Sequence, residues 1–240
     1  MVERGEQMAK MAKLHKKVYL VDAFDSFVYI LYQYFSEFAD EVRVVRVNES
    51  PLAELKRFNP DYLVLSPGPG HPRDIGFCEE PLAHSKIESP SAIARRLLPS
   101  KARGVSADST MGFLPIIDKT LGMGIPTLGA CLGHQSIGMY FGSNVVQAKH
   151  IMHGKQSLIE HDGKTIFTGM PNPFKGTRYH SLIVDRVPDG MELSAKSRDD
   201  GYIMGLRHKK YPIEGIQFHA ESITTERGKD IIKNFLHHYK

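Results

Sequence analysis

The chain has 240 residues, of which 41% are hydrophobic and 24% charged, and its formal net charge is +4. This composition is that of an ordinary globular protein with a substantial core, and it argues against a disordered chain or a strongly basic nucleic-acid binder. Two cysteines outside any CxxC pair argue against a disulfide framework, and no apolar run approaches a membrane span, so we expect a soluble cytoplasmic protein.

The first 65 residues alternate short apolar segments with a helical pattern. A polar leader covers residues 1–17. The apolar side chains between Phe27 and Phe38 recur on one helical face, and Asp25 or Ser26 is expected to cap this helix by accepting a backbone N–H. Alternating strands and helices predict a parallel sheet covered on both faces. The predicted strands are Val18–Asp22, Val42–Val47 and Tyr62–Leu65.

The third predicted strand ends in the loop SPGPGHP at residues 66–72. Its glycines allow backbone N–H groups to approach a substrate closely, and its prolines stiffen the path, which suits an oxyanion hole. Taken alone, such a loop is more often a rigid turn that closes a strand. The following range, 73–124, is interrupted by four prolines, and helices are expected within it at Ser91–Leu98 and Leu114–Leu121.

Cys131 lies between a predicted strand, Ile125–Gly129, and a predicted helix over residues 133–140. A sharp strand-to-helix turn projects a nucleophile outwards, and residues two positions away crowd the turn unless they are glycines, as Gly129 and Gly133 are. Partial positive charge and free N–H groups at a helix N-terminus favour a thiolate. An inert cysteine buried in a tight turn is the alternative, and the local pattern leaves the two about equal.

The chain beyond residue 142 consists of short alternating segments separated by Asp-Gly turns, which predicts antiparallel strands. The last predicted strand, Glu214–Phe218, precedes a C-terminal helix with Ile231 and Phe235 on its apolar face. Residues 18–240 are therefore predicted to form a single α/β domain. Its central sheet is mainly parallel and flanked by helices, with additional antiparallel strands in the C-terminal half.

A cysteine nucleophile in acyl transfer needs an imidazole to move protons and an acceptor to orient that imidazole. His219 follows the last predicted strand and is two residues from Glu221, so both side chains could project to the same side. Taken alone, such a pair is more often a surface pair. His180 is an alternative, whereas His134 is too close to Cys131 in sequence to face it easily.

Metal and nucleotide sites have little support in the sequence. The spacing His150-x-x-His153 suits a metal ion only with a further ligand, and none is compelling. Neither a GxGxxG nor a GxxxxGK[ST] pattern occurs. We therefore expect no metal and no cofactor.

Six segments, taken in order, resemble the class I (triad) glutamine amidotransferase family over nearly the whole chain. They are VDAFDSF at 21–27, SPGPGHP at 66–72, GACLGHQS at 129–136, HGK at 153–155, RYHSL at 178–182 and GIQFHAES at 215–222. The resemblance implies a flavodoxin-like glutaminase. In it, Cys131 attacks the side-chain amide of L-glutamine, His219 transfers protons and Glu221 orients His219.

The resemblance also implies an oxyanion hole at Gly68 and Leu132, the latter through its backbone N–H. More narrowly, the chain resembles the glutaminase subunits of anthranilate synthase and aminodeoxychorismate synthase. That implies delivery of ammonia to a chorismate-binding synthase subunit, with tryptophan biosynthesis favoured over folate biosynthesis. A catalytically silent, glutamine-binding regulatory module is the alternative from another class. The implied glutamine contacts are Gly68, Pro69, Gly70, Gln135, His180 and Ser181.

Two features depart from the family pattern. Ala220 stands where the family usually has proline between the histidine and the glutamate, which is expected to loosen the chain around His219 and Glu221. The range 73–124 is longer than expected between the SPGPG loop and the nucleophile, and we interpret it as an insertion that forms a surface subdomain.

Overall fold

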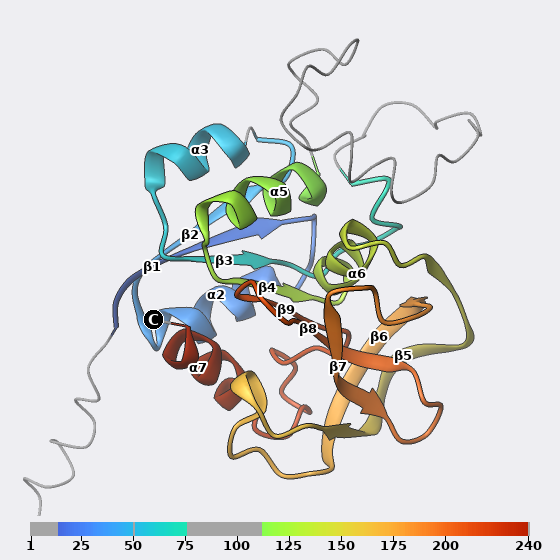
Figure 1. The fold of residues 1–240 in the computed structure, drawn as a ribbon. Helices are drawn as coiled ribbons and strands as arrows, with labels where there is room; N and C mark the ends of the chain where they lie inside the picture. The colour runs from blue at the N-terminus through green and yellow to red at the C-terminus, as the bar shows by residue number, and fades with distance from the viewer. Residues whose placement is uncertain (1–13, 50, 76–111, 240) are drawn as a thin grey trace, which may run out of the picture.

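The computed structural model describes residues 14–49, 51–75 and 112–239 (Figure 1). These residues form a nine-stranded sheet in the order β2-β1-β3-β4-β9-β8-β7-β5-β6. The strands are β1 Leu14–Asp22, β2 Ala39–Arg46, β3 Tyr62–Leu65, β4 Thr127–Ala130, β5 Val145–His161, β6 Phe174–Val184, β7 Met191–Ser197, β8 Ile203–His208 and β9 Ile213–Ile216. The helices are α2 Val28–Ser36, α3 Pro51–Phe58, α5 Phe113–Met123, α6 Leu132–Tyr140 and α7 Gly228–His238, with a 3-10 turn, η1, at Thr165–Phe167.

The sheet has a parallel half and an antiparallel half, as the predicted fold class requires. Strand β1 pairs in parallel with β2 and β3, and the parallel pairing continues through β4 to β9. From β9 outwards the pairing through β8, β7 and β5 to β6 is antiparallel. Because carboxyl ends of parallel strands meet at one edge, the segments after β1, β3, β4 and β9 converge there. Those segments carry four of the six family-like motifs.

Alternation along the strands divides the core between the two faces of the sheet. In β1, Val18 and Leu20 belong to the cluster that contains side chains of α2 and α7, whereas Tyr19 and Val21 belong to the cluster with α3, α5 and α6. Figure 1 shows the same layers, with α2 and α7 on one side and the other three helices opposite. Full burial of one such apolar side chain contributes roughly 1.5–3 kcal/mol.

Several boundaries differ from those predicted. Strand β1 begins at Leu14, inside the range predicted as a polar leader, because its first residues continue the pairing with β2. Helix α3 was not predicted; its eight residues bury only Pro51, Leu55 and Phe58, too few for a clear helical period. The predicted cap of α2 was wrong. Phe27 is the N-cap residue, without a side-chain cap, and Asp25 Oδ2 accepts the Phe27 N–H just outside the helix (3.1 Å).

Helix α5 lies inside the range 73–124 that was predicted as an insertion. It covers the predicted helix Leu114–Leu121 and buries Phe113, Ile116 and Ile117 in the core. The C-terminal end of that range is therefore part of the covering layer of the sheet. The other predicted helix, Ser91–Leu98, lies outside the described residues.

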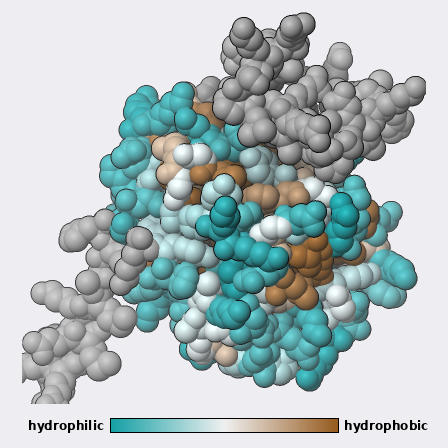
Figure 2. Space-filling view, in the orientation of Figure 1, coloured by the Kyte–Doolittle hydropathy of each residue, from teal (hydrophilic) through white to brown (hydrophobic). Residues whose placement is uncertain are grey.

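The outer surface is mixed in polarity. In the view of Figure 2, most of the surface over the described elements is hydrophilic, with a hydrophobic patch over the antiparallel strands. In the described part of the chain, no helix has the length and apolar character needed to span a membrane.

Candidate active site

Cys131 occupies a strained turn between β4 and α6. Its backbone has φ 49° and ψ −99°, in a region that a residue with a side chain rarely adopts, and its N–H donates to Ile216 O (2.8 Å). A Cβ on Gly129 would lie 2.5 Å from the carbonyl carbon of Gly133, and one on Gly133 would lie 2.5 Å from Leu65 O. The predicted need for both glycines is therefore confirmed, and the turn has the geometry of a nucleophile elbow.

Helix α6 begins at Leu132, immediately after the nucleophile. The first N–H groups of a helix have no acceptor within it, so the Leu132 N–H is available to a developing oxyanion. Gly68 lies against this residue, since a Cβ on Gly68 would be 2.8 Å from Leu132 Cδ2 and 2.6 Å from Ala23 O. The two predicted oxyanion residues are thus neighbours, and a larger residue at position 68 would push them apart.

His219 and Glu221 lie just after β9, where the backbone stops pairing with one neighbouring strand and begins to pair with another. The Gln217 N–H donates to Met204 O (3.0 Å) and the His219 N–H to Thr177 O (2.8 Å), so the segment passes from β8 to β6. This switch explains why β9 ends at Ile216 and not at Phe218 as predicted.

The two side chains form a buried dyad, with exposed fractions of 4% for His219 and 1% for Glu221. His219 Nδ1 donates to Glu221 Oε1 over 2.5 Å, and His219 Nε2 makes no hydrogen bond to the described residues. Ala220, between them, is itself buried in the core. The dyad forms without the proline that is usual in the family.

The charge state of His219 follows from its neighbours. Burial disfavours the imidazolium, but the carboxylate of Glu221 and then Cys131 outweigh it and raise the pKa of His219 well above its ordinary value of 6.5. The arrangement therefore favours an imidazolium beside the Cys131 sulfur, with Glu221 on its far side. In this arrangement the proton is already on His219, the group that must deliver it to a leaving amine.

A cavity of about 150 Å³ opens beside Cys131. All six predicted glutamine contacts line it, which brings loop 66–72 and strand β6 together with the elbow. Tyr179 and Leu182 were not predicted individually, although both lie in the RYHSL segment that carried the resemblance. The lining residues are Gly68, Pro69, Gly70, Cys131, Gln135, Tyr179, His180, Ser181 and Leu182.

Neither His180 nor His134, the other two histidines considered for proton transfer, can replace His219. His180 accepts a hydrogen bond from Arg178 Nε at Nε2 (3.0 Å) and donates from Nδ1 to Leu182 O (3.1 Å), so both ring nitrogens are occupied. Burial and then Arg178 lower the pKa of His180 to about 3. His134 is fully buried with its ring against Gly215 and does not line the cavity beside Cys131, and burial lowers its pKa to about 4. Both rings are neutral at physiological pH.

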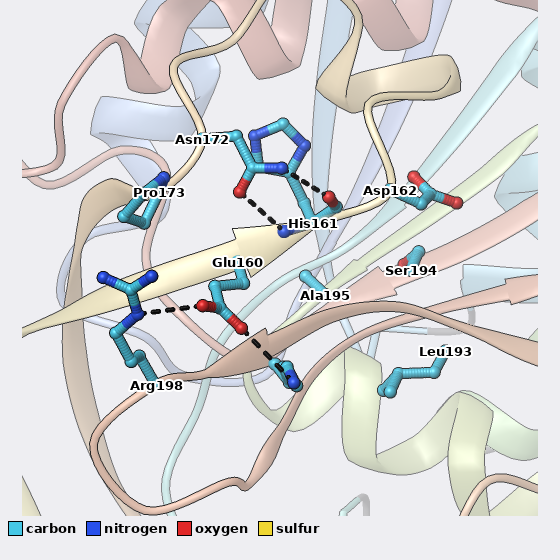
Figure 3. A pocket seen from close by; sticks show the side chains of 10 residues that line it. Glu160, His161, Asp162, Asn172, Pro173, Leu193, Ser194, Ala195 and Arg198 are labelled. Atoms are coloured by element: carbon cyan, nitrogen blue, oxygen red, sulfur yellow. Dashed lines mark hydrogen bonds and ion pairs between the residues drawn. The ribbon is translucent and has the colours of Figure 1, made fainter.

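A larger cavity, of about 440 Å³, lies between β5, β7 and the Asn172-Pro173 segment (Figure 3). Its titratable groups are already engaged: Glu160 pairs with Arg198 (2.8 Å) and Lys196 (3.3 Å), and His161 Nε2 donates to Pro171 O (2.8 Å). The hydroxyl of Ser194, which also lines this cavity, makes no hydrogen bond to the described residues, so no base is positioned to activate it. In the described ranges, no group of three His, Cys, Asp or Glu side chains is placed to hold a metal ion.

Asp25 lies close enough to the dyad to respond to its charge. Burial raises the pKa of the Asp25 carboxyl from 3.8 to about 6, and the charge of Glu221 adds to this increase. The folded chain therefore binds more protons than the unfolded chain between about pH 4 and pH 6, and stability from protonated Asp25 is lost as the pH rises through about 6.

The variant Asp25→Asn is accordingly expected to be more stable than wild type at about pH 7.5, by about 1–3 kcal/mol, and nearly unchanged at about pH 4. Urea unfolding at both pH values measures the difference. Asp189→Asn, at an exposed turn residue, is the matched control. Equal effects of Asp25→Asn at the two pH values would mean that the Asp25 carboxyl does not have the raised pKa assigned to it.

The fold, the elbow and the dyad together define a cysteine-dependent amidotransferase, and comparison with known proteins agrees. A model of the glutamine amidotransferase class-I family matches residues 19–94 and 103–239, so the chain belongs to this family. Anthranilate synthase component 2 of Methanocaldococcus jannaschii is 43% identical over 229 residues, which cover 92% of this chain and 96% of that protein. Aminodeoxychorismate/anthranilate synthase component 2 of Bacillus subtilis is 39% identical, with coverages of 85% and 87%.

One further relative is much longer than this chain, and a solved structure shares its fold. The bifunctional protein TrpGD of Thermotoga maritima is 42% identical over 198 residues; these cover 82% of this chain but only 27% of that protein. A solved structure of a putative GMP synthase subunit from Thermoplasma acidophilum superimposes with a TM-score of 0.68 at 26% identity, covering 92% of each chain. The fold is therefore shared across more than one branch of amidotransferases.

Proposed function

We propose that this chain is the glutaminase subunit of an anthranilate synthase, which hydrolyses L-glutamine and delivers ammonia to a chorismate-using synthase subunit. The observation that carries the proposal is the placement of the strained Cys131 at a cavity lined by all six expected glutamine contacts. The buried His219–Glu221 dyad supplies the proton transfer that amide hydrolysis requires. The chemistry uses the chain's own side chains and needs no cofactor.

The reaction begins with attack of the Cys131 sulfur on the side-chain carbonyl carbon of glutamine. The new S–C bond produces an oxyanion that the backbone N–H groups of Leu132 and Gly68 stabilise. His219 then gives its proton to the departing nitrogen, so that ammonia leaves and a γ-glutamyl thioester remains on Cys131. Neutral His219 next takes a proton from water, whose oxygen attacks the thioester and releases glutamate and the sulfur.

Support for the chorismate pathway comes from the relatives, whose names include both anthranilate synthase and aminodeoxychorismate/anthranilate synthase. Service to an aminodeoxychorismate synthase, alone or in addition, is therefore a second candidate. The two functions differ in the position of the new amino group, ortho to the carboxylate in anthranilate and para in aminobenzoate. The proposed partner is a separate synthase subunit in a hetero-oligomer.

The test combines active-site labelling with a product assay. A diazoketone analogue of glutamine is expected to alkylate Cys131, detected by peptide mass spectrometry, and the co-purified partner should form the ortho product from chorismate and glutamine. Formation of the para product alone would transfer the assignment to aminodeoxychorismate synthesis. Failure to label Cys131 with the partner present would favour a silent glutamine-binding module instead.

A further inference from the structure

Gln217 contacts the nucleophile from within the core, between β9 and the dyad. Its side chain is fully buried, and its Nε2 donates to Cys131 Sγ over 3.5 Å. The triad chemistry described above does not use this residue. We propose that Gln217 is a further catalytic residue, the amide donor that stabilises the Cys131 thiolate.

Gln217 belongs to a hydrogen-bond network that begins at Arg178, and the direction of its bond to Cys131 is determined at the Leu182 carbonyl of that network. A guanidinium can only donate, so the bond from Arg178 Nε makes His180 Nε2 an acceptor and leaves the ring proton on Nδ1. His180 Nδ1 therefore donates to Leu182 O (3.1 Å). The tautomer of His180 thus follows from its partners.

Leu182 O accepts from Gln135 as well as from His180, and this second bond orients the two glutamines. A carbonyl only accepts, so Gln135 must present its Nε2 to Leu182 O (3.0 Å), and the same Nε2 donates to Gln217 Oε1 (3.2 Å). Rotating the Gln217 amide by 180° would place two NH₂ groups against each other. The Gln217 amide nitrogen is therefore directed at the sulfur.

Arg178 anchors this hydrogen-bond network from a fully buried position in β6. Its guanidinium donates to the carboxylate of Asp200 (2.8 Å) and to the hydroxyls of Ser157 (2.9 Å) and Ser197 (3.2 Å). These bonds connect β6 to β5, β7 and the turn before β8. Because every member is buried or partly buried, the orientation of Gln217 is held by the fold before any substrate arrives.

The contact matters most when Cys131 loses its proton. As a thiol, the sulfur has a weak acceptor in Tyr179 O (3.9 Å), to which a thiolate can no longer donate. The thiolate needs donors, and the buried amide N–H of Gln217 supplies one from within the core. A hydrogen bond to a charged group is worth about 10- to 100-fold in the equilibrium it favours. This role rests on Cys131 acting as the thiolate nucleophile of the proposed function.

The test measures alkylation of Cys131 by iodoacetamide as a function of pH, in a Cys78→Ser background so that only one thiol reacts. The variant Gln217→Glu keeps an oxygen for Gln135 but presents an acceptor to the sulfur, and Gln217→Met fills the space without a donor. The pH of half-maximal alkylation rate is expected to rise by about 1–2 pH units in both, which corresponds to 10- to 100-fold less thiolate. In glutaminase assays, kcat should fall by a similar factor with KM within about 3-fold.

Gln147→Glu and Gln147→Met are the matched controls, because Gln147 is exposed on β5 and does not line the cavity. Their alkylation profiles should match that of wild type. A folded Gln217→Met variant, verified by thermal unfolding, with an unchanged half-maximal pH would overturn the proposal. Alkylation needs neither glutamine nor the partner, so this result is separable from a failure of the proposed glutaminase function.

Discussion

Replacement of Cys131 by serine is expected to abolish glutamine-dependent product formation by the complex and to leave ammonia-dependent formation intact. An alcohol stays protonated where a thiol ionises, so the variant lacks the nucleophile that begins thioester formation, and the loss should be at least about 10³-fold. The exchange of sulfur for oxygen is nearly isosteric, so the strained turn and the core around Gly129 and Gly133 should persist. Supplied ammonia bypasses the glutaminase and reaches the partner directly.

Activity with glutamine and with an ammonium salt, measured on the same purified complex, checks this prediction. Cys78→Ser, at the other cysteine of the sequence, is the control and should retain both activities. Loss of both activities in a folded Cys131→Ser complex would contradict the assignment of Cys131 to glutamine hydrolysis. Retention of both would mean that another group supplies the ammonia.

Local patterns in the sequence offered the elbow and the dyad as candidates, because their steric and chemical logic is local, and the family resemblance was needed to choose them over the alternatives. Glycines two residues on either side of Cys131 are needed by the turn itself, and the structure has both in contact with backbone atoms. His219 and Glu221 are two residues apart, so no long-range arrangement had to be known for their pairing to be predicted. The resemblance then selected this pair from 12 histidines.

Features that depend on distant partners were not predictable in the same way. The end of β9 is set by a change of partner from Met204 to Thr177, and periodicity along the strand does not contain that information. Gln217 lay inside a quoted motif, yet its contact with Cys131 spans 86 residues and depends on Gln135 to orient its amide. The prediction of a cap for α2 was wrong because the Asp25 carboxylate accepts the N–H of Phe27, the residue before the helix.

Replacement of Glu221 by glutamine is expected to lower kcat for glutamine hydrolysis by roughly 10²- to 10⁴-fold, with a smaller change in KM. The amide has the same shape but no charge, so the imidazolium beside Cys131 loses the carboxylate that favours it. The pKa of His219 should then fall towards its ordinary value, since Glu221 is the strongest of the neighbours that raise it. A proton that His219 no longer holds at neutral pH cannot be given to the leaving ammonia.

The measurement is an NMR titration of the His219 ring in the folded chain, alongside steady-state kinetics. In wild type, the raised pKa means that the stability contributed by the ion pair is present below about pH 6.5 and is lost only as the pH rises through the higher folded value. In Glu221→Gln this loss should move to lower pH. Glu37→Gln, which removes an exposed carboxylate paired with Lys229 on the surface, should change kcat less than about 2-fold. If the His219 ring titrates at the same pH in Glu221→Gln as in wild type, the carboxylate does not hold the imidazolium, and its role would be limited to orienting the ring through the Nδ1 hydrogen bond.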